Sequence, residues 1–178
     1  MGKDNKLQIQ KIPYELGRVS NESKEFFGVV RKLDIRKLVN ESNLQNKQRP
    51  LSLQKLRKVN EKATVGEVAL ILAKLNNFYG DKNAMHEDMI WEVSEMILDA
   101  YPFYNMYDIG LCCHMGKLGK FGKVYGSLNG GVVMGWFSEY EILRMTAILD
   151  RNDEERAKHQ WSIGDRVSGS LKDIFRKK

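Results

Sequence analysis

Residues 64–80, TVGEVALILAKLNNFYG, contain the clearest secondary-structure pattern in this chain of 178 residues. Apolar side chains recur there at the three- and four-residue spacing of an amphipathic helix. The repeating residues are Val65, Val68, Ala69, Leu72, Leu75 and Phe78. Thr64 and Glu67 have the spacing of a capping box, and Gly80 stands where a left-handed residue commonly ends a helix. The pattern predicts a helix that begins at Thr64 and ends just before Gly80.

Helical spacing also prevails on both sides of this stretch, and no segment alternates apolar and polar residues as a half-buried strand does. We expect further helices over about residues 20–40, 51–62, 83–100, 105–116, 132–160 and 167–175. Asn83 and Asn105 are the expected N-caps of two of them, and Met89 and Met96 are expected on a buried face. The sequence therefore predicts an all-α fold, with a compact domain of four to six helices and an extended basic N-terminal arm.

A polar stretch divides the chain into two expected parts. Residues 41–50, ESNLQNKQRP, are polar and close with a proline, which is typical of a linker. Residues 1–19 show no clear period and are expected to be the arm. We therefore expect an N-terminal arm and helix with a polar linker over residues 1–50, and the main helical domain over residues 51–178.

The composition is that of a folded intracellular protein. The apolar share is 42% and the charged share 29%, which is ordinary for a globular domain. The only cysteines, Cys112 and Cys113, are neighbours that cannot easily reach disulfide geometry, so a reducing compartment is expected. No apolar run approaches the roughly 18 residues of a membrane span, and residues 1–20 lack the apolar region of a secretion signal. Membrane insertion and secretion are both disfavoured.

The net charge of +6 is unevenly distributed along the chain. Residues 1–62 carry +8, residues 63–115 carry −6 and residues 116–178 carry +4. An acidic middle between two basic segments could leave one face free to bind a polyanion. It could equally let the parts of the chain attract one another, and the sequence leaves both alternatives open.

Residues 116–126, GKLGKFGKVYG, are the best candidate for a binding site. Glycine lets backbone amides approach an anion, lysine supplies charge, and an aromatic ring can stack on a base. The expected nucleic-acid-binding residues are Lys117, Gly119, Lys120, Phe121, Gly122, Lys123 and Tyr125. The spacing excludes the phosphate loop of nucleotide hydrolases, which needs G-x-x-x-x-G-K-[ST].

The same loop could instead be a tight connection between two helices, with its lysines in water and its two aromatic rings in the core. Three lysine–phosphate contacts would give only about a 40-fold loss of affinity between about 50 and 200 mM salt. The loop alone would therefore bind weakly. Tight binding would need the basic segment 47–62, the C-terminal lysines or oligomerisation.

Four aromatic residues near Pro102 are candidates for contact with a protein partner, with core packing as the alternative. They are Tyr101, Phe103, Tyr104 and Tyr107. No comparable set points to catalysis. Cys112, Cys113 and His114 are consecutive and have no second ligand pair at zinc spacing, so buried small cysteines and no metal or cofactor are expected. An enzyme, most plausibly a nuclease, is the least favoured class.

Short motifs between about residues 89 and 144 carry a resemblance to a known family. They are ILDAYP at 97–102, YDI at 107–109 and GKVY at 122–125, followed by Leu128, Gly130, Trp136, Tyr140 and Arg144. This part of the chain resembles a family of small helical proteins of phages and mobile elements of gut Bacteroidales bacteria. The order of helices also resembles the non-ATPase loaders that bring a phage replicative helicase to DNA. The resemblance implies a setting in the bacterial cytoplasm, or in a virion, rather than a particular chemistry.

Together these features favour a non-enzymatic accessory protein of a phage or mobile element. It would bind nucleic acid or a DNA-replication partner through the Gly/Lys-rich loop. The alternative is a structural protein of the virion, or a protein that captures a host protein. Which partner is bound, and whether the chain self-associates, is not fixed by the sequence.

Overall fold

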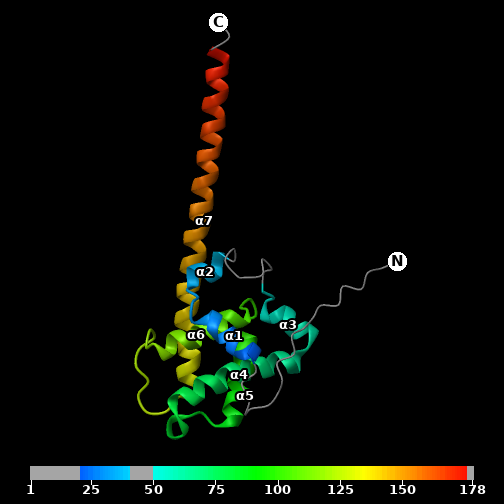
Figure 1. Ribbon diagram of the computed structural model, residues 1–178, viewed down its shortest axis with the longest axis vertical. Helices are drawn as coiled ribbons and strands as arrows, with labels where there is room; N and C mark the ends of the chain where they lie inside the picture. Colours follow the sequence, from blue (N-terminus) through cyan, green and yellow to red (C-terminus); the bar gives the residue numbers. More distant parts are fainter. Residues whose placement is uncertain (1–20, 41–49, 176–178) are drawn as a thin grey trace, which may run out of the picture. The chain divides into compact units, whose positions relative to one another are not determined.

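The computed structural model describes residues 21–40 and 50–175, and side chains between residues 24 and 159 (Figure 1). The predicted arm, residues 1–19, and the linker residues 41–49 lie outside the described residues. The elements are α1 (Asn21–Val30), α2 (Ile35–Asn40), α3 (Leu53–Val59), α4 (Glu61–Tyr79), the 3-10 turn η1 (Asp81–Asn83), α5 (Glu87–Ala100), α6 (Met106–Lys117) and α7 (Gly130–Phe175). Seven α-helices and no strand in this part of the chain confirm the all-α prediction.

The chain divides into two units. The first contains α1, α3 to α6, η1 and the residues of α7 as far as Phe137. The second contains α2 and α7 from Ser138 onward. The division into residues 1–50 and 51–178 that the linker suggested stays a prediction.

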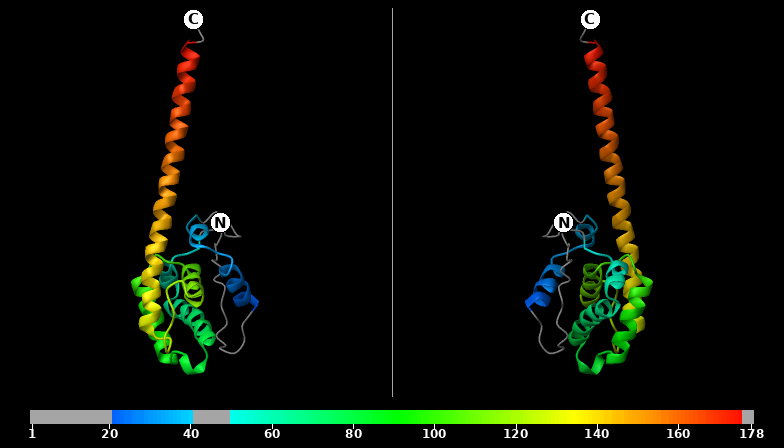
Figure 2. Two further views of the ribbon diagram at one scale, coloured as in Figure 1. Left: turned by 90° about the vertical axis from the view of Figure 1, so that its left-hand side faces the viewer. Right: turned by 90° about the vertical axis from the view of Figure 1, so that its right-hand side faces the viewer.

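The helix α4 is the centre of the first unit and packs against α3, α5 and α6 (Figure 1 and Figure 2). It begins earlier than predicted, because Asn60 is the N-cap and its side chain accepts a hydrogen bond from the Ala63 amide at 3.0 Å. The predicted capping box at Thr64 and Glu67 is wrong, since both residues lie inside the helix. The Thr64 hydroxyl donates instead to the Asn60 carbonyl at 2.8 Å. Gly80, with φ of +75°, ends the helix as expected.

The core of the first unit surrounds the apolar residues of α4. Val68, Leu72 and Leu75 are fully buried. Fully buried side chains from the neighbouring elements are Leu53 of α3, Ile97 of α5, Ile109 of α6, Leu128, and Val133 and Phe137 of α7. Phe78 is the exception to the predicted apolar repeat, because 60% of its side chain is exposed.

The helix α5 was predicted to begin at Asn83, but it begins at Glu87. The hydrogen bonds of the Asn76 side chain and the turn η1 explain the difference. The Asn76 amide group donates to the Met85 carbonyl at 2.9 Å and accepts from the Met85 amide at 2.6 Å. This buried pair holds the chain extended before α5, so Asn83 ends η1 and His86 is the N-cap. The face of α5 is also shifted from the prediction. Val93 and Ile97 are buried, whereas Met89 and Met96 are exposed.

The predicted start of α6 is confirmed. Asn105 accepts hydrogen bonds from the Tyr107 and Asp108 amides at 2.8 and 3.2 Å, and its own amide donates to Asp108 at 3.0 Å. These contacts form the capping box. The turn before it also serves α3, because the Leu53 amide donates to the Tyr104 carbonyl at 2.7 Å. Otherwise this first amide of α3 would have no acceptor.

The helix predicted over residues 20–40 is two helices. After α1, the Lys32 amide donates to the Val29 carbonyl at 2.9 Å and closes a turn. Asp34 then accepts a hydrogen bond from the Lys37 amide at 2.7 Å and starts α2. A side chain that satisfies a free helix-start amide makes a new helix here favourable. The separate helix expected over residues 167–175 is likewise corrected, since α7 continues without a break to Phe175.

In the second unit, α2 is held against α7 by polar contacts around a small apolar face. Arg36 lies 3.4 Å from the Asp150 carboxylate, and the Arg151 guanidinium donates to the Val39 carbonyl at 3.0 Å. Leu38 and Val39 are buried. These contacts lie wholly within the second unit.

Gly116 shows how closely α6 and α7 approach within the first unit. A Cβ atom added there would lie 2.4 Å from the Trp136 ring, which is itself buried.

We expect Gly116→Ala to lower the free energy of unfolding by about 1–3 kcal/mol, because the large ring must shift in a packed core. Urea denaturation followed by circular dichroism measures this. Gly135→Ala is the matched control on α7, with no atom within 4 Å of the added Cβ. It should be neutral or stabilising by up to about 1 kcal/mol. Equal stability of the two variants would contradict the close packing.

Candidate nucleic-acid interface

The Gly/Lys-rich loop turns sharply between α6 and α7. The glycines with positive φ in it are Gly119 at +72°, Gly122 at +91° and Gly126 at +80°. The Gly119 amide donates to the Gly116 carbonyl at 2.9 Å, and the Gly122 amide donates to the Gly119 carbonyl at 3.1 Å. The Lys120 amide donates to the Met115 carbonyl at 3.1 Å. These amides therefore have acceptors within the turn, and the assignment of Gly119 and Gly122 to nucleic-acid binding stays a prediction.

The side chains of the loop separate into a packed set and an exposed set. The Phe121 ring lies 6.3 Å from the Trp136 ring, so it belongs to the packing between the loop and α7. Lys120, Lys123 and Tyr125 are exposed, and Tyr125 is 86% exposed. Tyr125 is therefore the more exposed of the two aromatic rings in the loop, and Phe121 is partly buried.

Lys117 differs from the other two lysines, because it ends α6 and is half-buried. Its ammonium lies 3.4 Å from the Lys74 carbonyl and 5.6 Å from the centre of the Phe78 ring. Both partners belong to α4. The side chain thus turns away from the loop, toward a group of positive charges on α1, α4 and α6.

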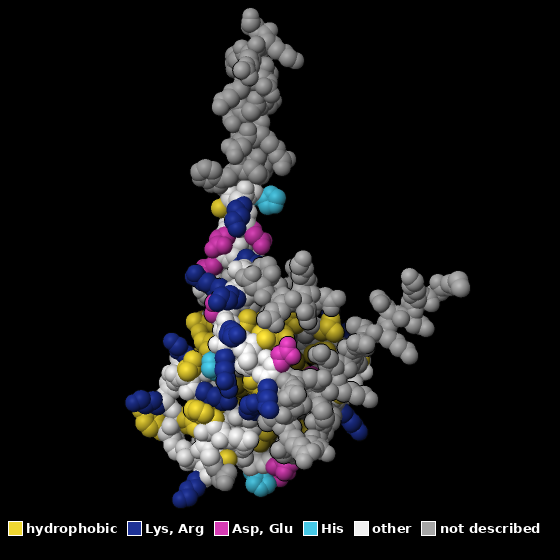
Figure 3. Space-filling view, viewed as in Figure 1, with side chains coloured by type: hydrophobic (Ala, Val, Ile, Leu, Met, Phe, Trp, Pro, Cys, Tyr) yellow, Lys and Arg dark blue, Asp and Glu magenta, His cyan; other side chains and the backbone are white. Residues whose placement is uncertain are grey.

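This group, which we name the cationic cluster, was not anticipated from the sequence. Its members are Lys24 of α1, Arg31 just after α1, Lys74 of α4, and His114 and Lys117 of α6. Dark-blue Lys and Arg side chains gather over α1 and α6 on the face seen in Figure 3. Among the described residues, none of the five makes an ion pair with a carboxylate.

The spacing of the basic residues along the sequence indicates part of the cluster. His114 and Lys117 are three residues apart and lie on one face of α6, whereas Arg31 follows Lys24 by seven residues, just after α1 ends. Lys74 is one of only two basic residues in the acidic segment 63–115. Sequence alone could not show that these three helices bring their charges together. The packing of α1 on α6 and of α6 on α4 does so.

Like-charge repulsion within the cluster appears in the pKa values. Partial burial lowers the pKa of Lys74, and the charges of Arg31 and Lys24 lower it further. Burial also lowers the pKa of Lys117; Cys113 acts in the opposite direction, and Lys74 and Arg31 lower this pKa further. Burial lowers the pKa of His114, and Lys117 and Arg31 act in the same direction. Partial burial, and then neighbouring positive charge, thus lower the pKa values of Lys74, Lys117 and His114.

Aromatic rings fix the two lysines of the cluster that come from α4 and α6. The Lys74 ammonium lies 4.1 Å from the centre of the Phe27 ring, a close cation–π contact. Phe27 in turn packs edge-on against Phe26, which stacks on Tyr107 at 5.2 Å. Lysines held in place lose less side-chain entropy when they meet a phosphate than freely moving ones do.

The predicted partner-binding aromatics have different surroundings. Tyr101 and Tyr104 are buried, stack on each other at 4.9 Å and pack against Phe137. Their burial assigns them to the core rather than to a partner surface. Tyr107 is half-buried against α1, and burial raises its pKa. Phe103, which is 75% exposed, stays available to a partner.

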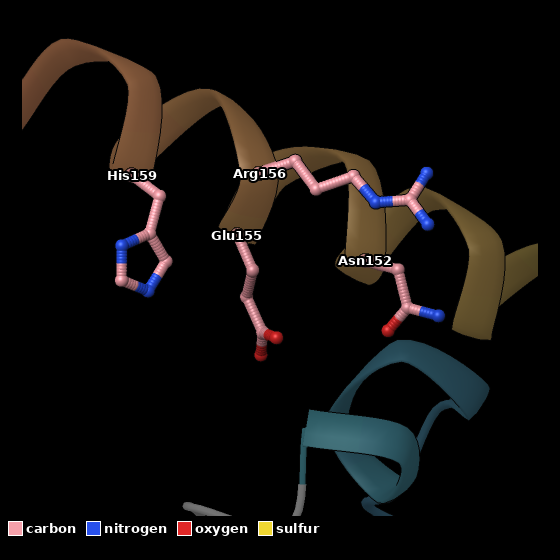
Figure 4. A pocket seen from close by; sticks show the side chains of 4 residues that line it. All are labelled: Asn152, Glu155, Arg156 and His159. Carbon is pink, nitrogen blue, oxygen red and sulfur yellow. The ribbon is translucent and has the colours of Figure 1, made fainter. Parts of the chain in front are cut away.

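Other groups that could carry chemistry do not converge. Where the chain is described, no three His, Cys, Asp or Glu side chains are placed to hold a metal ion. A depression in the second unit is lined by Asn152, Glu155, Arg156 and His159. Figure 4 shows that all four come from α7, with the Arg156 side chain running along the helix. Their spacing is that of a single helix face, which is typical of a solvated helix surface.

Comparisons with known proteins give no assignment for this site. No protein-family model, curated protein or solved structure matches the chain. The resemblance to the phage and mobile-element family stays a prediction. Within the described ranges, no helix is both long and apolar enough to cross a membrane.

The two cysteines beside His114 are buried, as expected. Burial raises the pKa of Cys112 well above its usual value and that of Cys113 to about 12. The thiolate is the reactive form, so at about pH 8 the folded chain should react with a disulfide reagent such as DTNB at least about 10³-fold more slowly than a free thiol. The same protein in urea is the control, and both of its thiols should react there. Fast labelling of either cysteine in the folded protein would contradict this.

Proposed function

We propose that this protein binds the phosphate backbone of nucleic acid without catalysing a reaction. The observation that carries the proposal is the cationic cluster, in which charges from α1, α4 and α6 meet without a carboxylate partner among the described residues. Phosphates neutralise such charges and release counterions from the nucleic acid. In the setting that the resemblance implies, the protein is an accessory factor of a phage or mobile element.

The interface combines the cationic cluster with the exposed side chains of the loop. Lys24, Arg31, Lys74 and Lys117 supply four charges, and Lys120 and Lys123 supply two more. Six phosphate contacts would give a salt slope of about −4 to −5, and hence a loss of about 10³-fold in affinity between about 50 and 200 mM salt. This is much more than the loop lysines could supply alone.

A double charge removal tests the cluster. We expect Arg31→Gln with Lys74→Gln to reduce the salt slope by about 1.4–1.8, because each phosphate contact contributes about 0.7–0.9. The measurement is fluorescence anisotropy of a labelled oligonucleotide at several salt concentrations. Folding should be retained, since the change relieves like-charge repulsion.

Lys82→Gln with Lys158→Gln is the matched control for that variant. Both lysines are exposed, on η1 and α7, and the pair removes the same net charge. The control should bind nearly as well as the unchanged protein. If both double variants lose affinity equally, the protein attracts nucleic acid only through its net charge, and the assignment of the cluster fails.

The affinity should also depend on pH through His114. In the free protein its pKa is lowered from 6.5, chiefly by burial and also by Lys117 and Arg31, so the side chain is neutral at neutral pH. A bound phosphate brings negative charge, raises this pKa and causes proton uptake. Affinity should therefore rise as the pH falls from about 7.5 to about 5.5. His114→Gln should flatten this rise, and an unchanged pH profile would place His114 outside the interface.

Binding of a protein partner is the second candidate function. Exposed Met89, Trp91 and Met96 on α5 favour it, because adaptable apolar side chains are common at protein interfaces. Phe103, in the turn after α5, is a further exposed apolar side chain of the first unit. Absence of nucleic-acid binding in the anisotropy experiment, together with a homogeneous complex in solution, would favour this candidate over the first.

A further inference from the structure

An exposed aromatic ring lies at the edge of the cationic cluster. Phe78 belongs to the last turn of α4, and 60% of its side chain is exposed although its spacing predicted a core position. A single exposed apolar residue is ordinary in itself. This ring differs in its neighbour, because the Lys117 ammonium lies 5.6 Å from its centre.

The two lysine–aromatic contacts of the cluster differ in how much of each ring they leave exposed. Phe27 is partly buried and has the Lys74 ammonium 4.1 Å from its centre, so its face is covered. The longer contact of Lys117 and the high exposure of Phe78 leave most of the second ring open. The Phe78 ring also forms a T-shaped pair with the ring of its neighbour Tyr79, with 5.2 Å between their centres. An open ring thus lies next to a positive charge that the fold keeps in position.

We infer that the nucleic acid bound here is single-stranded, and that one of its bases stacks on Phe78 while neighbouring phosphates meet the cationic cluster. In a duplex the faces of the bases are covered by their neighbours, so the ring would have nothing to stack on. A single strand offers open base faces along with its phosphates, and stacking on aromatic side chains beside positive charge is the general mode of binding it. The exposed Tyr125 of the loop supplies a second ring. This inference rests on the proposed function.

The experiment compares three ligands of about 20 nucleotides: a deoxythymidine strand, an abasic strand and a duplex. The abasic strand keeps the phosphates but has no base to stack. The unchanged protein should bind the deoxythymidine strand best. Phe78→Leu keeps an apolar side chain but removes the ring, and it should weaken that binding at least about fivefold. Its affinity for the abasic strand and for the duplex should not change. Phe78→Tyr should retain the binding.

Phe103→Leu is the matched control, because Phe103 is also a largely exposed phenylalanine of the first unit but lies in the turn before α6. It should bind all three ligands as the unchanged protein does. The inference is overturned if Phe78→Leu binds the deoxythymidine strand normally, or if it loses affinity for all three ligands alike. The proposed function fails in a different way, which is no effect of Arg31→Gln with Lys74→Gln on any ligand, or no binding by the unchanged protein.

Discussion

Burial of α4 on several sides is the constraint on which the first unit depends. Three helices pack against it, and its residues Val68, Leu72 and Leu75 are inaccessible to solvent. A helix surrounded in this way cannot rotate without exposing apolar area, which costs about 25 cal/mol for each Å². The direction of its remaining side chains is therefore fixed. Lys74 and Phe78 reach the surface because the apolar face of the helix is packed inside.

The cationic cluster is maintained against its own repulsion. Folding lowers the pKa of Lys74 and of Lys117, so the folded chain holds their protons less tightly than the unfolded chain does. These two groups therefore contribute less to stability below their lowered pKa values than above their usual pKa of 10.5. Sites where a fold accepts such a local cost are commonly sites of function. An anion that binds only the folded chain would offset the cost and stabilise the protein.

The glycines at the end of α6 and in the loop that follows it illustrate two structural uses of one residue type. Gly116 is buried and leaves room for the Trp136 ring, whereas Gly119 and Gly122 adopt positive φ and close the turn with their own amides. The regular spacing of Gly and Lys had suggested a single anion-binding device. In the structure, the glycines build the connection, and the lysines divide between the cluster and the solvent-facing loop.

The sequence by itself determined the helical class, the end of α4 at Gly80, the capping box at Asn105 and the burial of the two cysteines. These features depend on backbone hydrogen bonds and side-chain spacing within a few residues, which the sequence displays directly. Only the tertiary structure decided that Lys74 meets Lys117 and that Phe78 is exposed. Those facts depend on which faces of α1, α4 and α6 pack together, and helical periodicity does not specify how one helix face pairs with another.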